Sequence, residues 1–168
     1  IKQYIGEAYF FRAYSYFDLL QLYGDVIITK KPLDITDPEM KVKRNDRSEV
    51  VDLIIDDLNH AVENLPAFKE LTTEEEGRIS KEGAQAFLSR VALYEGTWQK
   101  SRNGNQNTQR SANLLDIAAK AARTVIDAKY GYTFRLFGTD SETKILGDSA
   151  QKYMFILENE KSNPAGIK

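Results

Sequence analysis

Apolar residues recur along this chain at intervals of three and four positions, which is the spacing of one face of an α-helix. The pattern predicts four helical segments, each bounded by residues that start or stop helices. The first covers about residues 2–23 and ends at Gly24. The second begins at Asp46 and Glu49, whose D-x-x-E arrangement can cap a first turn, and ends at Pro66.

Two further helices are predicted in the second half of the chain. The third begins after Ser80, a capping residue, and ends near Gly96, with Trp98 following at once. The fourth begins after Ser111 and stops at Gly131. Beyond it the helical stripe is lost, and the stretch KYMFILEN predicts a short strand or extended segment.

The spacing of these elements predicts a stacked arrangement. Helix starts near residues 48, 80 and 111 lie 32 and 31 positions apart, which favours antiparallel stacking although the strict tetratricopeptide consensus is absent. The predicted fold is therefore all-α, an antiparallel helical-repeat array with an irregular C-terminal segment. We expect residues 1–168 to form a single domain.

The first helix carries aromatic side chains around its full circumference. Seven aromatic residues occur between positions 6 and 26, and a helix that is apolar all round is usually buried on every side. An alternative is a tyrosine platform that stacks on sugar rings. Arg12 lies among these rings, where an unpaired charge would be costly, so we expect a structural ion pair with Glu7, Asp18, Asp57 or a later carboxylate.

Composition excludes several function classes. The 23 basic and 25 acidic residues are intermixed and give a net charge of −2, so neither nucleic acid nor an anionic membrane surface is an expected partner. The chain has no cysteine, hence no disulfide or thiolate nucleophile, and it lacks metal-ligand spacings and phosphate-binding glycine loops. We therefore expect no metal and no cofactor. The chain does not begin with methionine, which favours a processed protein or a fragment.

Candidate chemistry is sparse. The single His60 sits on the polar face of the second helix, where a solvated histidine is the expected interpretation. No pair of carboxylates is placed for acid–base catalysis, so no enzyme is predicted. One region combines an aromatic ring with polar donors, the chemistry that sugar recognition uses: Trp98, with Arg102 and Asn103, is the candidate ligand site.

Four sequence blocks carry a resemblance to a known family. In order they are GEAYFFRAYSYFDLLQLYGDV, RSEVVDLIIDDLNHAVENLP, GRISKEGAQAFLSRVALYEGTW and AAKAARTVIDAKYGYTFRLF. Together they resemble the SusD/RagB family of outer-membrane glycan-binding lipoproteins, over roughly residues 1–137. The resemblance implies an all-α fold of divergent tetratricopeptide-like helix pairs. It also implies a non-catalytic, surface-exposed lipoprotein that captures a glycan, or in some members a peptide, for a TonB-dependent transporter.

The chain also departs from the family pattern. Ile27 stands where the family has proline, and members contain several hundred residues with a lipid-bearing cysteine near the start. We therefore expect a central fragment, whose membrane association depends on an absent N-terminal lipid anchor and whose glycan contacts lie largely outside it. The alternative is a helical-repeat scaffold that binds another protein.

Overall fold

The computed structural model describes residues 1–75, 77–102 and 108–134. Contacts divide the chain into residues 1–132 and 133–168, and all the helices described below belong to the first unit. Within the described residues the one pairing of strand type is an isolated antiparallel bridge between Val26 and Asn45. The extended segment predicted for KYMFILEN lies outside the described residues.

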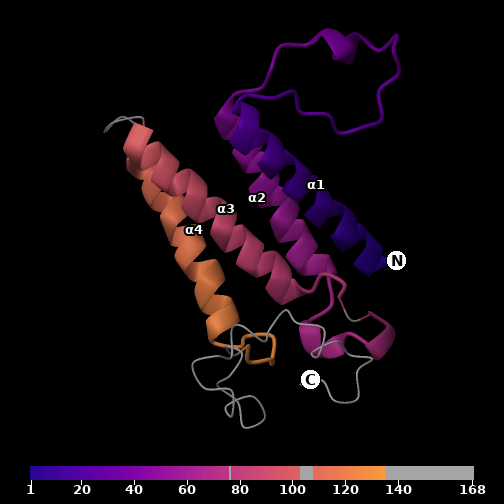
Figure 1. Cartoon of the computed structure of the whole chain (residues 1–168), viewed down its shortest axis with the longest axis vertical. Coiled ribbons are helices and arrows are strands. Elements are labelled where there is room, and N and C mark those ends of the chain that lie inside the picture. Colours follow the sequence, from indigo (N-terminus) through magenta and orange to yellow (C-terminus); the bar gives the residue numbers. More distant parts are fainter. Residues whose placement is uncertain (76, 103–107, 135–168) are drawn as a thin grey trace, which may run out of the picture. The chain divides into compact units, whose positions relative to one another are not determined.

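Four α-helices follow one another along the described part of the chain. They are α1 (Lys2–Tyr23), α2 (Arg47–Asn64), α3 (Lys81–Arg102) and α4 (Thr108–Ile126). Each packs against the next, and the chain reverses direction at every connection, which makes an antiparallel array (Figure 1). The all-α fold predicted from the sequence is confirmed. None of the described helices is both long and apolar enough to cross a membrane.

The core lies where the apolar stripes of the successive helices meet. Burying each leucine, isoleucine, valine or phenylalanine side chain contributes about 1.5–3 kcal/mol, so these stripes decide which helix faces pair. The side chains that form the centre of the core are at most 7% exposed: Phe10, Ala13, Phe17 and Leu20 from α1, Val50, Val51, Ile54, Leu58 and Ala61 from α2, and Ala84, Leu88 and Val91 from α3.

The predicted starts of α2 and α3 are confirmed by their first-turn hydrogen bonds. The backbone N–H of Asp46 donates to Glu49 Oε2 at 3.2 Å, as the capping arrangement requires. Ser80 Oγ accepts the backbone N–H of Gly83 at 3.3 Å. At the far end of α1, Gly24 has φ 71°, a conformation that glycine adopts without a steric penalty.

The predicted end of α3 and start of α4 are wrong, and both errors have one cause. α3 continues through Gly96 and Trp98 to its end at Arg102, and α4 begins three residues before Ser111. Gly96 lies at the contact between the two helices, where a Cβ atom would be 3.0 Å from the Leu115 side chain. Ser111 Oγ donates to the Gly96 carbonyl at 2.8 Å. The glycine and the serine therefore join two helices.

The predicted stop of α4 is also misplaced. The helix ends at Ile126 and is followed by turns, so it stops before Gly131. Gly131 has φ 83° and Ala128 has φ 52°, and two left-handed residues close together cannot continue a right-handed helix. On the exposed side of α4, Lys120 Nζ lies 2.6 Å from Asp116 Oδ2.

The connection between α1 and α2 is anchored at its base. The Tyr16 hydroxyl accepts the backbone N–H of Thr29 at 2.7 Å and lies 3.3 Å from the carbonyl of the same residue. Asn45 accepts the N–H of Ile28 through Oδ1 at 2.9 Å and donates its own backbone N–H to Val26. These bonds hold the two ends of the connection together, while the residues between them extend away from α1 and α2 (Figure 1).

α1 is not buried on every side, which corrects the expectation drawn from its composition. Its face toward α2 is buried, but Tyr4, Phe11 and Leu22 on the opposite face are 64%, 59% and 74% exposed. The helices next to α1 are α2 and, through aromatic side chains, α3, and neither of them covers the opposite face. At the N-terminal end of that face, Arg78 lies over the Tyr4 ring.

Candidate functional site

Trp98 lies within α3 and is partly buried. The guanidinium carbon of Arg47, at the start of α2, lies 4.0 Å from the centre of the Trp98 ring. It also lies 5.9 Å from the centre of the Tyr94 ring. This cation–π arrangement occupies one face of the indole and stabilises the contact between α2 and α3 by about 0.5–2 kcal/mol. A sugar ring could stack only on the opposite face of Trp98.

Arg47 is held over this ring by a buried carboxylate. Arg47 Nε and Nη2 lie 2.9 Å and 2.8 Å from Glu95 Oε2, and the Glu95 side chain has no exposed surface. Gln99 Nε2 donates to the other oxygen, Glu95 Oε1, at 2.7 Å. A buried carboxylate requires such partners, because leaving it unpaired costs several kcal/mol. A cluster of four side chains holds α2 against α3: Arg47 from α2, and Tyr94, Glu95 and Trp98 from α3.

The other two residues of the predicted ligand site are placed only in part. Arg102 is exposed at the last position of α3, one helical turn beyond Trp98. Asn103 lies outside the described residues. The ligand site at Trp98, Arg102 and Asn103 therefore stays a prediction. What the structure adds is that Trp98 already has a structural contact.

Arg12 is paired with Asp57, which is one of the carboxylates expected from the sequence. Arg12 Nε and Nη2 donate to the two carboxylate oxygens at 2.7 Å and 2.6 Å. The Asp57 side chain is 1% exposed and that of Arg12 is 34% exposed. Hydrogen bonding to Asp57 raises the pKa of the Arg12 guanidinium, because the bonds favour its charged form. The pair joins α1 to α2.

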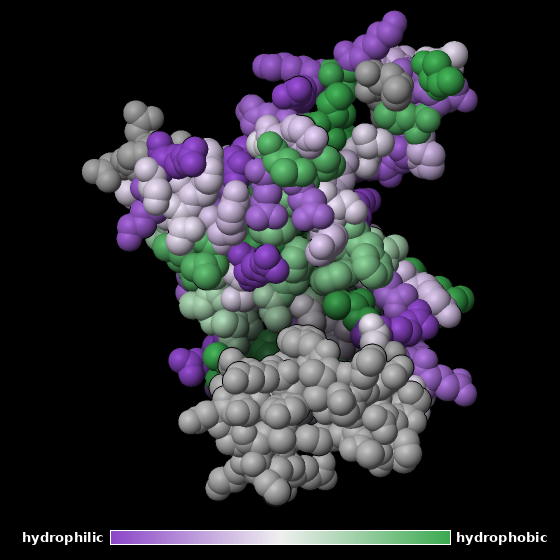
Figure 2. All heavy atoms as spheres, in the orientation of Figure 1, coloured by the Kyte–Doolittle hydropathy of each residue, from purple (hydrophilic) through white to green (hydrophobic). Residues whose placement is uncertain are grey.

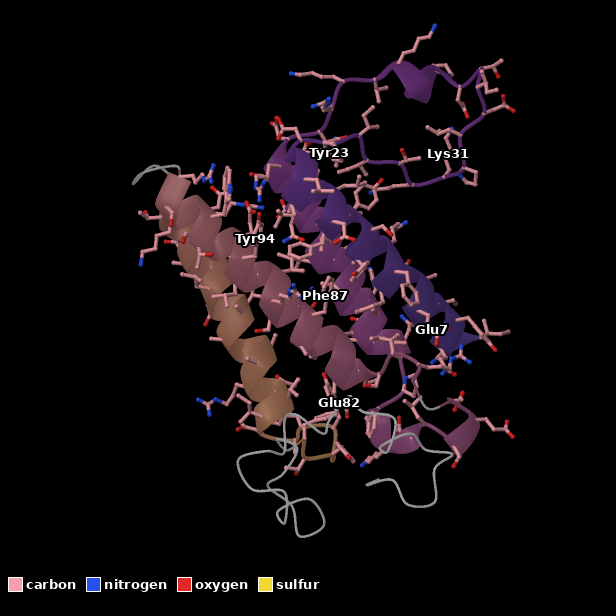
Figure 3. The ribbon with its side chains drawn as sticks, viewed as in Figure 1. Glu7, Tyr23, Lys31, Glu82, Phe87 and Tyr94 are labelled. Atoms are coloured by element: carbon pink, nitrogen blue, oxygen red, sulfur yellow. The ribbon has the colours of Figure 1, made fainter. Side chains whose placement is uncertain are left out.

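Two more arginines make similar bonds between distant elements. Arg78, before α3, donates to both oxygens of Glu7 at 2.7 Å, which raises the pKa of Arg78. Glu7 lies in the N-terminal part of α1 (Figure 3). Arg110 of α4 donates to Asp52 of α2 at 2.7 Å. Each pair joins residues that are more than 50 positions apart in sequence. The two parallel bonds between Arg78 and Glu7 also give geometric specificity.

Aromatic side chains fill the space between α1 and α3. Figure 3 shows Phe87 and Tyr94 of α3 in this space. Tyr14 stacks on Phe87 with ring centres 5.5 Å apart and an interplanar angle of 28°. Phe17 meets both rings of α3 edge-on. Tyr14 is 46% exposed, so this cluster presents part of its surface to solvent.

Two open depressions run along α2 and share Asp52 and Asp56. One borders the connection between α1 and α2, and the other borders α4. Among the described residues that line them there is no aromatic ring, so neither offers the flat apolar face on which sugars stack. The depressions are therefore weaker candidates for a glycan than the Trp98 region.

His60 lies on the solvent side of α2, as its sequence context indicates. Its side chain is 44% exposed, and its ring nitrogens lie 3.5 Å from Glu63 and 3.8 Å from Asp56. The Tyr9 ring lies 5.0 Å away. Within the described residues no group of three or more histidine or acidic side chains is placed to hold a metal ion.

Sequence reasoning missed the buried pair of Arg47 and Glu95. A signal was present: Glu95 is four positions after Val91 and seven after Leu88, so it continues the apolar stripe of α3. A charged residue at a core position requires a partner. The sequence contains several possible cations, and only the packing of α2 on α3 selects Arg47.

Comparison with known proteins identifies the class to which this array belongs. The family model described as starch-binding and associating with the outer membrane, the SusD-like family, matches residues 1–93. This match covers α1, α2 and the first half of α3, and it includes the Arg12–Asp57 pair and Phe87 of the aromatic cluster. The chain belongs to the SusD-like family.

Related sequences and solved structures agree with this assignment. A SusD-like protein of Formosa agariphila, P38, is 37% identical over 93 residues, which are 55% of this chain and 17% of that protein. A SusD-like protein of Bacteroides ovatus is 29% identical over 123 residues, or 73% of this chain and 20% of that protein. This chain therefore spans about a fifth of the length of these relatives.

The solved structures extend the likeness to the whole array. The crystal structure of a SusD-like protein from Bacteroides fragilis has 32% identity and a TM-score of 0.61, covering 82% of this chain and 22% of that one. A laminarin-binding SusD-like protein has 28% identity and a TM-score of 0.59, covering 80% of this chain and 26% of that one. Over most of this chain, the four-helix array therefore has the same fold as the corresponding part of these SusD-like proteins.

Proposed function

We propose that this chain is part of a protein that captures an oligosaccharide at the bacterial surface and delivers it to a TonB-dependent outer-membrane transporter. The observation that carries the proposal is the family match over residues 1–93, whose description is starch binding in association with the outer membrane. The laminarin-binding relative supports a carbohydrate ligand. Partnership with a transporter rests on the resemblance to the SusD/RagB family.

The working unit is proposed to be longer than these 168 residues. The relatives extend well beyond the matched region, since that region is 17% and 20% of their lengths. We propose that residues 1–168 form one helical domain of such a protein, and that a lipid anchor in another segment holds it at the outer membrane. Within this domain the proposed glycan contacts are Trp98, Arg102 and Asn103.

The protein is proposed to bind its glycan without hydrolysing it. Glycoside hydrolysis requires two carboxyl groups about 5–10 Å apart on either side of the substrate, free to act as acid and base or nucleophile. Three carboxylates of the described array are buried. Asp57 and Glu95 each bond to an arginine from another helix, and Glu82 accepts the backbone N–H of Phe68 at 2.8 Å. The bonds of these carboxylates serve the packing of the helices. Release of reducing sugar from laminarin or starch by the purified full-length protein would contradict the proposal.

Calorimetric titration tests the proposed ligand and site together. The full-length protein is titrated with laminarin and with soluble starch, and the same titrations are made with the 168-residue chain. We expect heat of binding from the full-length protein and weak or no heat from the chain, because other segments complete the site. Absence of binding by the full-length protein to any polysaccharide in a broad panel would refute carbohydrate capture.

Variants of Trp98 test the proposed binding site independently of the proposed function. Trp98→Ala removes the ring and should weaken binding by about 1–3 kcal/mol, the usual contribution of an aromatic anchor, whereas Trp98→Phe keeps a stacking face. Because Trp98 also contacts Arg47 at 4.0 Å, melting temperatures of both variants must be recorded. Unchanged glycan binding by folded Trp98→Ala would leave the function standing and move the site elsewhere.

A further inference from the structure

The outer face of α1 carries a second apolar stripe, directly opposite the stripe that packs on α2. Its members recur at intervals of three and four residues along nearly the whole helix, which is the pattern of a helix–helix contact. They are Tyr4, Ala8, Phe11, Ser15, Leu19 and Leu22. All six are exposed, and the four large ones are 64%, 59%, 39% and 74% exposed in chain order. We call these six residues the outer stripe.

The composition of the outer stripe is that of a packing surface. Large residues alternate with Ala8 and Ser15, whose small side chains allow a second helix to approach closely, as ridges fit into grooves. None of the six residues is charged, but charged residues border the stripe: Asp18 at one edge, Arg12 at the other, and Arg78, whose guanidinium carbon lies 4.8 Å from the centre of the Tyr4 ring. Figure 2 shows hydrophobic surface over α1 and the neighbouring part of α3. An apolar surface that extends along an entire helix is uncommon on a monomer.

The opposite end of the array is built differently. The outer side of α4 carries ion pairs between residues one turn apart, Asp116 with Lys120 at 2.6 Å and Arg123 with Asp127 at 3.9 Å. Repeat arrays need polar outer faces at their ends, because each apolar face must be covered by a neighbour. By this criterion α4 presents a polar side to solvent, whereas α1 presents the face of an internal helix.

We infer that a further helix of the same polypeptide, outside residues 1–168, packs along the outer stripe and makes α1 an internal helix of the array. The length of the relatives supports this occupant, since the matched regions make up 17–20% of the curated relatives and 22–26% of the solved ones. A stripe without charged members fits a permanent contact within one chain, because transient partners meet through more polar surfaces. The inference does not depend on what the protein binds.

Covalent footprinting of the unmodified proteins tests this inference without any substitution. The full-length protein and the 168-residue chain are labelled with hydroxyl radicals at matched low concentration, and modification of Tyr4 and Phe11 is quantified by mass spectrometry. We expect at least about tenfold less labelling of both residues in the full-length protein, because a packed helix excludes the reagent. Tyr132, 38% exposed near the end of the described chain, provides a reference position.

Other occupants of the stripe give different outcomes. If labelling falls only as the concentration of the full-length protein rises, a second copy covers the stripe and the inference is wrong. If it falls only when another protein is added, the stripe is a docking surface and the inference is also wrong. Equal labelling of the two proteins under all conditions would overturn it outright.

A double substitution gives a second, independent readout. Phe11→Ser with Leu22→Ser removes two large members of the outer stripe, both more than half exposed in this chain. In the full-length protein we expect the melting temperature to fall by about 5 °C or more, because the lost groups are buried there. In the 168-residue chain at low concentration we expect a smaller fall, because both residues are more than half exposed there and Phe11 contacts only the edge of Phe10. A fall in neither protein would contradict the inference, and Lys120→Ser serves as the surface control in both.

Discussion

At the scale of single residues, arginine–carboxylate pairs connect parts of the array that lie far apart in sequence. Arg12 with Asp57 and Arg78 with Glu7 use two parallel hydrogen bonds each. Arg47 with Glu95 adds a cation–π contact to Trp98. Such pairs are weak evidence for net stability, because desolvation of the charges offsets their attraction. We infer that they help to select one arrangement of the helices.

Replacement of Arg12 tests this interpretation. Arg12→Met leaves the Asp57 carboxylate, which is 1% exposed, without its partner. We expect the free energy of unfolding to fall by about 3 kcal/mol, the cost of breaking one side of a buried pair. Urea unfolding followed by circular dichroism measures the change.

The second partner supplies the control for this experiment. Asp57→Asn in the Arg12→Met background removes the unpaired charge, so the double variant should be more stable than Arg12→Met alone. If Arg12→Met is as stable as the parent chain, the guanidinium is not the internal tie that the 2.6 Å and 2.7 Å bonds indicate.

At the scale of elements, glycines allow two pairs of helices to approach closely. A Cβ atom at Gly6 of α1 would lie 2.9 Å from Leu65 Cγ and 3.0 Å from its backbone nitrogen. At Gly96 of α3 it would lie 3.0 Å from the Leu115 side chain of α4. Glycine weakens an isolated helix by about 1 kcal/mol relative to alanine, and at these two positions the close packing accounts for its presence.

Alanine substitutions at two glycines should therefore act in opposite directions. Gly6→Ala must displace the backbone at Leu65, and we expect a loss of about 1–3 kcal/mol from overpacking. Gly83→Ala meets only the end of the Ile79 side chain, at 3.0 Å, which can rotate away. There the gain in helix propensity should dominate and raise stability by a few tenths of a kcal/mol or more. Equal effects of the two substitutions in urea unfolding would show that the close approach at Gly6 is unimportant.

At the scale of the whole molecule, the described array is polar at α4 and apolar along the outer side of α1. The exposed Tyr4, Phe11 and Leu22 give this chain a surface that associates in water, since burying apolar area is favourable without regard to partner. In the full-length protein we expect the same surface to be covered, as inferred above.

The isolated 168-residue chain should therefore self-associate. We expect multi-angle light scattering at tens of micromolar to give a mass above the 19.1 kDa of the monomer. The Phe11→Ser and Leu22→Ser double variant should give a mass nearer the monomer, while Lys120→Ser should behave like the parent. A monomeric parent chain across the concentration range would count against an associating outer stripe.

Much of the fold could be predicted from local pattern. The three- and four-residue spacing places all four helices, and the capping residues Asp46 and Ser80 locate two of their starts, because both signals act within a few residues. The same locality explains the errors. From local pattern, Gly96 predicts a helix end and Ser111 a helix start. In the structure both lie inside helices, and the Ser111 hydroxyl donates to the Gly96 carbonyl to join α4 to α3.

The candidate site was less predictable than the fold. Trp98 stood out by composition, but its contact with Arg47 depends on how α2 packs against α3. The partner of Arg12 could be narrowed to a few carboxylates, and only the structure selects Asp57. In the same way, composition showed that α1 is apolar on all sides, whereas the packing shows which side α2 covers and which side stays open.

The sequence by itself determined the helices and the family, since helical periodicity is local and the family blocks follow the linear order of residues. Tertiary structure alone decided which charges pair, which face of Trp98 is occupied and which stripe of α1 remains exposed. The physical reason is distance along the chain: Arg47 and Glu95 are 48 residues apart, and only the packed helices bring their side chains within 3 Å. Such contacts depend on the whole arrangement of α1 to α4, which no short window of sequence contains.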